Sequence, residues 1–325
     1  MTRRFQDIDL STLPPPPALE VLDYEGILSA RLDEFKARWE AVRQDHPDLP
    51  EYDVELLQTD PAVIIEQADS YHEMLLRGRV NDAVRAVMLA TSWGANLDHL
   101  GARVGATRLA EETDTAYRRR IQLAYEVLST AGPYGAYVWH ALSAHPGIKD
   151  AAAYGPEEDF AAPGEAWVTV MGAAGNGSPT MQMLMAVAAR LGAFQVQAGG
   201  APLNVWQPGN AQAQRARPLT DKVIVHACEA IPYQIEATIV VPPGPDVNVI
   251  YATALERLQV ATASRHRIGG VMPVSLINAA LHAACGASLS QVDTVLLASP
   301  TSDVGGEPRK APFCTGIDVK MELAT

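Results

Sequence analysis

The sequence is poor in cysteine, poor in aromatic residues and short of basic residues relative to acidic ones. Its three cysteines, Cys228, Cys285 and Cys314, lie far apart and form no CxxC pair. This spacing argues against a disulfide framework or a structural zinc site and favours free thiols in a reducing cytosol. The balance of 25 lysines and arginines against 38 aspartates and glutamates gives a net charge of −13. Such a charge disfavours a dedicated binder of nucleic acid or of an anionic membrane.

Long apolar runs are also missing. No segment approaches the roughly 18 apolar residues needed to cross a bilayer, and the opening stretch MTRRFQDIDLSTLPPPP has no apolar core of the signal-peptide kind. We therefore expect synthesis in the cytoplasm and no membrane insertion. Hydrophobic residues nevertheless make up 48% of the 325 residues, enough to bury real cores, and the length predicts two or three domains.

Motifs that carry chemistry are absent from the sequence. There is no GxSxG, no Walker loop and no strand-anchored GxGxxG, and the eight histidines include no HxxxH or HxH pair. Glu111, Glu112 and Asp114 precede three arginines at 118–120, an arrangement that predicts helix-end electrostatics rather than a glycosidase pair. We predict a protein that is not an enzyme, with no catalytic residue, no cofactor and no metal.

The N-terminal part is expected to be an arm followed by a helical domain. Residues 1–17 end in four prolines and predict an extended arm. Apolar residues then recur at steps of four and three and form a seam about two heptads long: Leu28, Leu32, Phe35, Trp39 and Val42. So short a seam cannot stabilise an isolated helix, so it must pack on another part of this chain or on another subunit. The pattern alone leaves both possibilities open.

Glycines punctuate the rest of the helical domain, which we expect to span 18–148. Asp60 and Pro61 are a good helix start, and the apolar pattern predicts one helix from there to Trp93-Gly94. Several residues then predict turns, which are ordinary helix caps or hinges between rigid parts. These candidate hinge and turn residues are Gly94, Leu97, Asp98, Leu100, Gly101, Gly105, Gly132 and Pro133.

Beyond residue 148 the pattern changes to alternating strands. A middle α/β domain is expected at 149–229, with strands at 166–172 and 221–228, a helix capped by Ser178, and a long loop at 194–216. A C-terminal α+β domain at 230–325 is expected to place two helices on one face of a sheet, with its last two strands joined as a hairpin. The predicted fold class is α+β: a helical domain followed by two smaller α/β domains with short sheets.

Several motifs resemble one family over residues 18–322. The stretch RVNDAVRAVMLATSWGANLDHLGARVGATR, followed by AYRRRIQLAYEVLSTAGPYGAY, is similar to the baseplate J family of contractile-tailed bacteriophages. RPLTDKVIV at 217–225, IPYQIEATI at 231–239, SRHRIG at 264–269 and FCT at 313–315 follow in the family's order. The segment at 194–216 is longer than the family's usual link, so no contact is transferred to it.

The resemblance implies a structural wedge subunit of a tail baseplate in the virion. It implies two copies of this chain per wedge, a smaller partner like tail protein I, a wedge protein like gpW or lysozyme, and a ring around a central spike hub. It also implies N-terminal helices bundled together, which would complete the seam, and hinges that let the wedge change angle on triggering. The alternatives are a tail-associated cell-wall hydrolase and a nucleic-acid-binding adaptor.

Overall fold

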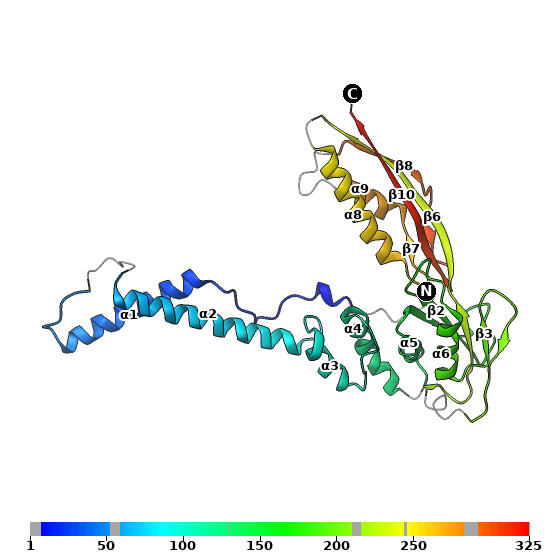
Figure 1. Cartoon of the computed structure of the whole chain (residues 1–325), viewed down its shortest axis with the longest axis horizontal. Coiled ribbons are helices and arrows are strands. Elements are labelled where there is room, and N and C mark those ends of the chain that lie inside the picture. The colour runs from blue at the N-terminus through cyan, green and yellow to red at the C-terminus, as the bar shows by residue number, and fades with distance from the viewer. Residues whose placement is uncertain are drawn as a thin grey trace. The chain divides into compact units, whose positions relative to one another are not determined.

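The chain forms two compact units, Ile8–Arg103 and Val104–Thr325 (Figure 1). The computed structural model describes residues 8–52, 59–129, 131–209, 216–243, 246–282 and 292–324. The boundary expected at 148/149 falls inside the second unit, because helix α5 (Tyr134–Leu142) packs on strand β1 (Ile148–Tyr154). The α+β class is confirmed, with helices first and short mixed sheets after them.

The first unit is helical. Its elements are a 3-10 helix η1 (Leu10–Thr12) and the helices α1 (Tyr24–Asp45), α2 (Pro61–Val87) and α3 (Gly94–Ala102). The predicted start of α2 is confirmed, since the Asp60 side chain accepts from the N–H of Ala62 and Pro61 opens the first turn. The predicted end at Gly94 is wrong. The Thr91 hydroxyl donates to the carbonyl of Arg85 at 2.9 Å and draws the chain into a turn after Val87.

The expected arm is only partly extended. Residues 1–7 lie outside the described residues, and η1 interrupts the stretch between them and the prolines. Farther along, the Glu20 backbone exchanges two hydrogen bonds with the Asn81 side chain of α2, at 3.0 and 2.8 Å. Asn81 is buried, so this contact fixes the segment before α1 along the second half of α2.

The second unit begins with helices α4 (Asp114–Leu123), η2 (Ala124–Leu128) and α5. Thr113 caps α4 by accepting from the N–H of Ala116. A five-stranded sheet follows in the order β1-β2-β5-β3-β4, in which β2 and β3 run parallel to β5. Its strands after β1 are β2 (Glu165–Gly172), β3 (Gln195–Gln197), β4 (Leu203–Asn204) and β5 (Lys222–Ala227).

Two details of this sheet differ from the sequence prediction. Helix α6 (Met181–Leu191) is capped by Thr180, not Ser178, because the Thr180 hydroxyl accepts from the N–H of Met183. The expected loop at 194–216 contains secondary structure. Its residues supply β3 and β4, and the rings of Phe194 and Trp206 stack with centroids 5.7 Å apart.

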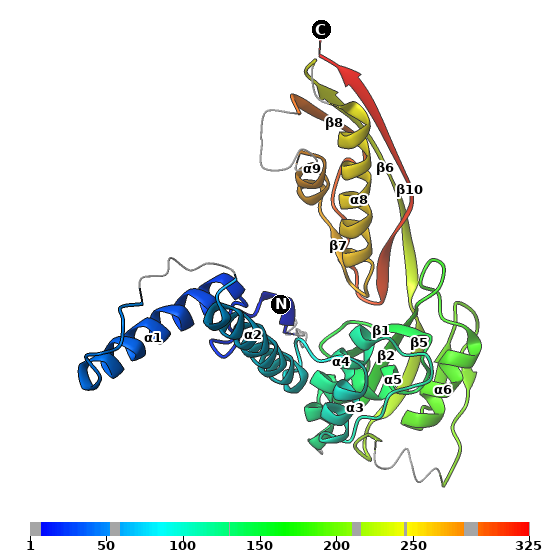
Figure 2. The same ribbon diagram turned by 60° about the vertical axis from the view of Figure 1, so that its left-hand side comes forward.

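The C-terminal part places two helices on one face of a three-stranded sheet (Figure 2). The strands are β6 (Glu229–Val241), β8 (Thr294–Ser299) and β10 (Lys310–Leu323), and the helices are α8 (Val247–Arg265) and α9 (Val274–His282). The predicted hairpin is wrong: the order is β10-β6-β8, and β10 runs parallel to β6. The connection cannot act as a tight turn because its strand β9 (Val304–Gly305) pairs instead with β7 (Val271–Met272).

Two apolar clusters hold the second unit together. One fills the space between the C-terminal sheet and its helices, from Ile235 and Ile239 to Leu258 and Leu281. The other joins the two sheets, because its members come from both: Tyr154, Trp167, Met171, Ile224, Ile268 and Ala311. Within the described ranges, no helix is both long and apolar enough to cross a membrane.

Candidate assembly interface

The first unit buries few large apolar side chains. Among its described residues, those that are buried are Ile27, Leu32, Val63 and Leu97. Thirteen others are exposed: Ile8, Leu13, Val21, Leu22, Val42, Ile64, Ile65, Tyr71, Leu75, Leu76, Val80, Val87 and Trp93. Contiguous exposed apolar surface on a folded protein is typical of an interaction site.

Most of that surface lies along one side of α2. Exposed apolar residues recur there at intervals of three and four, which places them on one broad side of a helix. We call this set the α2 apolar face: Ile64, Ile65, Ala68, Tyr71, Leu75, Leu76, Val80, Ala83 and Val87. Its large members are 50% to 70% exposed, whereas Val63, Ser70 and Asn81 on the opposite side are buried.

Charged contacts fix α1 against that opposite side. The Arg31 guanidinium of α1 bonds three carboxylates of α2, those of Glu66, Asp69 and Glu73, at 2.8 to 3.2 Å. Hydrogen bonds from Arg77 and Arg31 lower the pKa of the Glu73 carboxyl. The contacts of Arg31 therefore hold α1 against one side of α2 and leave the α2 apolar face uncovered.

The predicted seam on α1 is not one uncovered ridge. Leu32 is buried and Leu28 is half-buried. The rings of Phe35 and Trp39 lie against Tyr52, with centroids 5.0 and 6.2 Å away. Of the five seam residues only Val42 is exposed, at 46%. The chain itself covers most of this seam, so the uncovered helical surface is on α2 rather than on α1.

The glycine positions divide into two groups. Gly94, Gly105 and Gly132 have φ of +54°, +71° and +64°, the left-handed region that favours glycine. Gly101, expected as a turn, is instead a buried residue inside α3. Pro133 caps α5, which begins after Gly132 as the sequence predicted.

Residues Leu97, Asp98 and Leu100 belong to the body of α3. Leu97 is fully buried, Leu100 is half-buried and Asp98 is exposed on the polar side of the helix. The three residues therefore give α3 an ordinary amphipathic character. None of them lies at a turn, whereas Gly94 and Gly105, with positive φ, lie on either side of the helix body.

Two members of the acidic and basic cluster around 111–120 are buried. Glu112 and Arg120 form an ion pair of 2.6 Å, with side chains 5% and 4% exposed. Arg120 also donates to the Thr107 carbonyl and the Ser143 hydroxyl. Asp114 lies in the first turn of α4, in line with the predicted helix-end electrostatics. The Glu112–Arg120 pair instead joins the segment before α4 to the buried side of that helix.

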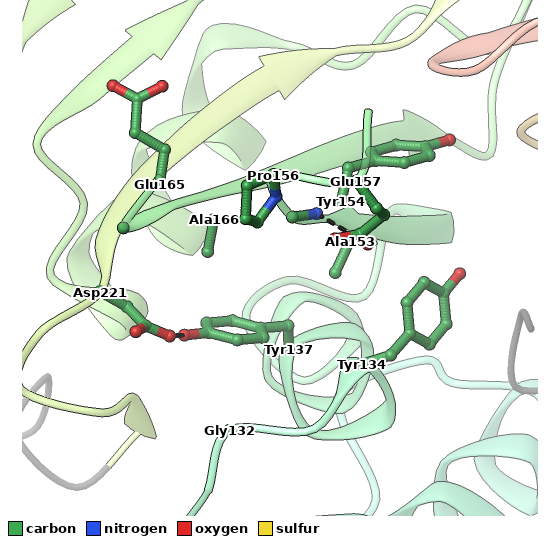
Figure 3. Close-up of a pocket in the computed structure, with 12 residues that line it drawn as sticks. Gly132, Tyr134, Tyr137, Ala153, Tyr154, Pro156, Glu157, Glu165, Ala166 and Asp221 are labelled. Carbon is green, nitrogen blue, oxygen red and sulfur yellow. Dashed lines mark hydrogen bonds between the residues drawn. The ribbon is translucent and has the colours of Figure 1, made fainter. Parts of the chain in front are cut away.

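A pocket of about 360 Å³ opens beside the start of α5 (Figure 3). At its floor the Tyr137 hydroxyl donates to Asp221, and burial together with this bond raises the pKa of Tyr137. Glu165 on its rim accepts from Lys222 and from the Trp167 indole at 3.0 Å each. Each of these polar side chains therefore has a hydrogen-bond partner within the chain. Gly132 lines the same pocket.

The described residues contain no group of three or more His, Cys, Asp or Glu side chains able to hold a metal ion. Cys228 and Cys314 are free thiols, and burial raises the pKa of Cys228 to about 12. Cys285 lies outside the described residues. The thiol of Cys228 is therefore protonated at neutral pH.

Sequence reasoning missed Asp150, which joins β1 to α4 and to the segment that follows α8. Its carboxylate accepts from the Arg119 guanidinium of α4 at 2.8 Å and from the N–H of Ile268 at 3.0 Å. The available signal was a lone acidic residue in the apolar strand IKDAAAY, since a charge buried in a strand needs partners.

Comparison with known proteins identifies the class first. A model of the baseplate J-like N-terminal domain matches residues 58–114, and a model of the baseplate J-like central domain matches residues 129–227. The first range contains α2 and α3, and the second contains α5, α6 and the five-stranded sheet.

A full-length relative narrows the identification. Baseplate protein J of Escherichia phage P2 is 32% identical over 323 residues, and the match covers 95% of each chain. The chain therefore belongs to the baseplate J-like family.

Proposed function

We propose that this chain is a structural wedge subunit of the baseplate of a contractile phage tail or tail-like particle. The observation that carries the proposal is the α2 apolar face, which the chain holds uncovered through the Arg31 contacts between α1 and α2. The similarity to a baseplate protein J supports the setting.

In this proposal, helices of neighbouring chains cover the α2 apolar face. Each side chain of the size of leucine or isoleucine contributes about 1.5–3 kcal/mol when it is fully removed from water, so several such residues favour a lasting complex. The partners we propose are a second copy of this chain and a smaller chain like tail protein I. A wedge protein like gpW or lysozyme and a central spike hub complete the ring.

The change of wedge angle on triggering belongs to the same proposal. The turns at Gly94 and Gly105 connect helices and adopt backbone conformations that few other residues tolerate. They are our candidates for the positions where rigid parts of the wedge turn, and Gly132-Pro133 is a third.

The test is co-purification of the full chain with its tail protein I-like partner after a change on the α2 apolar face. Leu76→Asp places a charge at a side chain that is 68% exposed, so the free chain should fold and unfold as before. Recovery of the partner should fall at least tenfold, because the complex would bury an unpaired carboxylate.

Val260→Asp on α8 is the matched control, since Val260 is 64% exposed on a helix of the other unit. It should leave recovery of the partner unchanged. Normal recovery with Leu76→Asp would contradict the helical interface, and equal loss with both variants would point to a general defect.

A further inference from the structure

The second unit has an apolar pocket between the segment that leads into α4 and the segment that leads into β1. We call it the α4–β1 pocket. Its volume is about 460 Å³, within the range of roughly 300–1,000 Å³ that is typical of ligand pockets. Its apolar lining consists of Leu109, Leu142, Pro146, Ile148 and Ala173. A pocket of this kind can hold the side chain of an aromatic anchor residue.

Two charged residues that line the α4–β1 pocket, Glu111 and Lys149, form no ion pair with any described residue. Glu111 has a φ of +58°, a conformation that residues other than glycine rarely adopt and that occurs at ligand sites. Neighbouring protein atoms remove water from the Lys149 ammonium and lower its pKa, and the charge of Asp150 opposes that shift. A ligand that carries a cation and an anion beside an apolar group would complement this lining.

The segment before α1 runs antiparallel to α2. The Tyr24 hydroxyl donates to the Gln67 carbonyl at 3.5 Å, and Glu20 contacts Asn81 farther along the helix. The chain before Glu20 therefore leads toward the C-terminal end of α2, the end that continues through α3 to the second unit. When extended, the residues between Ile8 and Glu20 span up to about 40 Å, whereas α2 beyond Asn81 is about 9 Å long.

The sequence before Ile8 complements the pocket. Residues 1–7, MTRRFQD, place Phe5 directly after two arginines and shortly before Asp7. The other segments that lie outside the described residues contain no aromatic residue. The N-terminal segment therefore offers an aromatic ring for the apolar lining, cations for Glu111 and an anion for Lys149.

We propose that the α4–β1 pocket binds the N-terminal segment of the same chain, with Phe5 as the anchor. The ring of Phe5 lies against the apolar lining. Arg4 faces Glu111, and Asp7 faces Lys149. Removal of the ring from water supplies most of the affinity, and the two charge pairs fix the direction of the segment.

Docking of this segment has a consequence for the turns between the helices. The segment continues into the first unit, so docking it on the second unit adds a connection besides the one through Gly94 and Gly105. This connection limits the turning that we propose for those glycines. That consequence rests on the proposed function, whereas the docking itself does not.

Photochemical cross-linking of the full chain tests the docking. A benzophenone amino acid at position 5 should attach to residues 109–116 or 142–149, as located by mass spectrometry after digestion. Ala116→Trp fills the pocket from the surface of α4, since Ala116 is exposed and lines the pocket. It should lower the cross-link yield by about fivefold or more, because a filled pocket has no room for a second ring. Thermal unfolding checks that this variant folds.

Charge reversal tests the contact between Arg4 and Glu111. Glu111→Lys should lower the yield by about threefold at low salt, and the joint change with Arg4→Glu should restore it. Glu157→Lys is the matched control, because Glu157 is an exposed glutamate of the same unit that lines a different pocket. It should leave the yield unchanged.

Three results would overturn the proposal. The first is the absence of a cross-link from position 5 to the pocket. The second is a yield that neither Ala116→Trp nor Glu111→Lys changes. The third is a cross-link that joins two chains, which would assign the pocket to the segment of a neighbouring copy.

Binding of the tail protein I-like partner separates this proposal from the proposed function. Ala116→Trp should keep that partner, because it leaves the α2 apolar face unchanged. Leu76→Asp should keep the cross-link within the pocket. Failure of either proposal therefore leaves the other one standing.

Discussion

At the scale of single residues, the buried charged groups are the positions where a substitution should strongly destabilise the second unit. Arg120 and Glu112 are almost fully buried and satisfy each other together with the Thr107 carbonyl and the Ser143 hydroxyl. Removing one member leaves the other charge in a low-dielectric interior without its partner, which costs far more than removing both.

We expect Arg120→Met to lower the free energy of unfolding by about 3–5 kcal/mol. The double variant Arg120→Met with Glu112→Leu should lose less than the single one. Urea unfolding of the full chain, followed by circular dichroism, measures both. A double variant that is less stable than the single one would show that the unpaired Glu112 charge is not the main cause of the loss.

His140 gives the second unit a dependence on pH. Burial, and after it the charge of Arg190, lowers the pKa of His140 to about 4. The unfolded chain has the ordinary value of about 6.5, so between these values it binds a proton that the folded chain does not. Stability from this residue is therefore complete above pH 6.5 and falls as the pH drops towards 4.

His140→Gln should flatten this part of the stability curve, with a difference on the order of 3 kcal/mol at its lower end. Thermal unfolding between pH 7 and pH 4 measures it against the wild-type chain. His99→Gln is the control because His99 is exposed on α3. Parallel curves for wild type and His140→Gln would contradict the assignment.

Sequence reasoning recognised single residues where their chemistry is local. Asp60 caps α2 by a bond within its own turn, so its neighbours in the sequence were sufficient to find it. Arg120 and Asp150 act on groups distant along the chain, and no spacing revealed those partners.

At the scale of elements, the glycine turns differ in what surrounds them. A Cβ at Gly105 would meet no atom within 4 Å, so only its positive φ resists substitution. At Gly132 the same positive φ is combined with close contact to the ring of Pro218. Both positions lie in the second unit, so their costs can be compared directly.

We expect Gly105→Ala to cost about 1–2 kcal/mol from backbone strain alone. Gly132→Ala should cost more, because Pro218 must also move. Thermal unfolding of the two variants gives the comparison. Equal losses would mean that the Pro218 contact adjusts freely.

The order of the C-terminal strands shows the limit of pattern reading. Alternation along 233–241 and 316–323 identified β6 and β10 as strands with one buried face. Alternation carries no information about which strands are neighbours, and only proximity in the sequence favours a hairpin. The β7–β9 pair diverts the connection, and that pairing is not local.

At the scale of the whole molecule, the two units differ in how many apolar side chains each of them buries. The second unit encloses two apolar clusters, one of them under its C-terminal helices. Buried apolar residues of the first unit are few, while its α2 apolar face is exposed. Since burial of apolar surface is the main driving force of folding, the units should differ in independent stability.

A fragment of residues 104–325 should therefore unfold cooperatively, with a midpoint close to that of the full chain. A fragment of residues 1–103 should be helical but should unfold with little cooperativity and exchange its amide hydrogens rapidly. Circular dichroism and hydrogen exchange test both. A cooperative, well-protected helical fragment would contradict the view that its surface awaits other chains.

The passage between the two sheets has a mechanical meaning. β5 ends at Ala227 and β6 begins at Glu229, so extended backbone continues from one sheet into the next through the single buried residue Cys228. A flexible linker would first extend before it transmitted tension, whereas this one-residue connection has almost no spare length. A force applied to the C-terminal sheet is therefore transmitted directly to the five-stranded sheet. The second unit should respond to force as one stiff body.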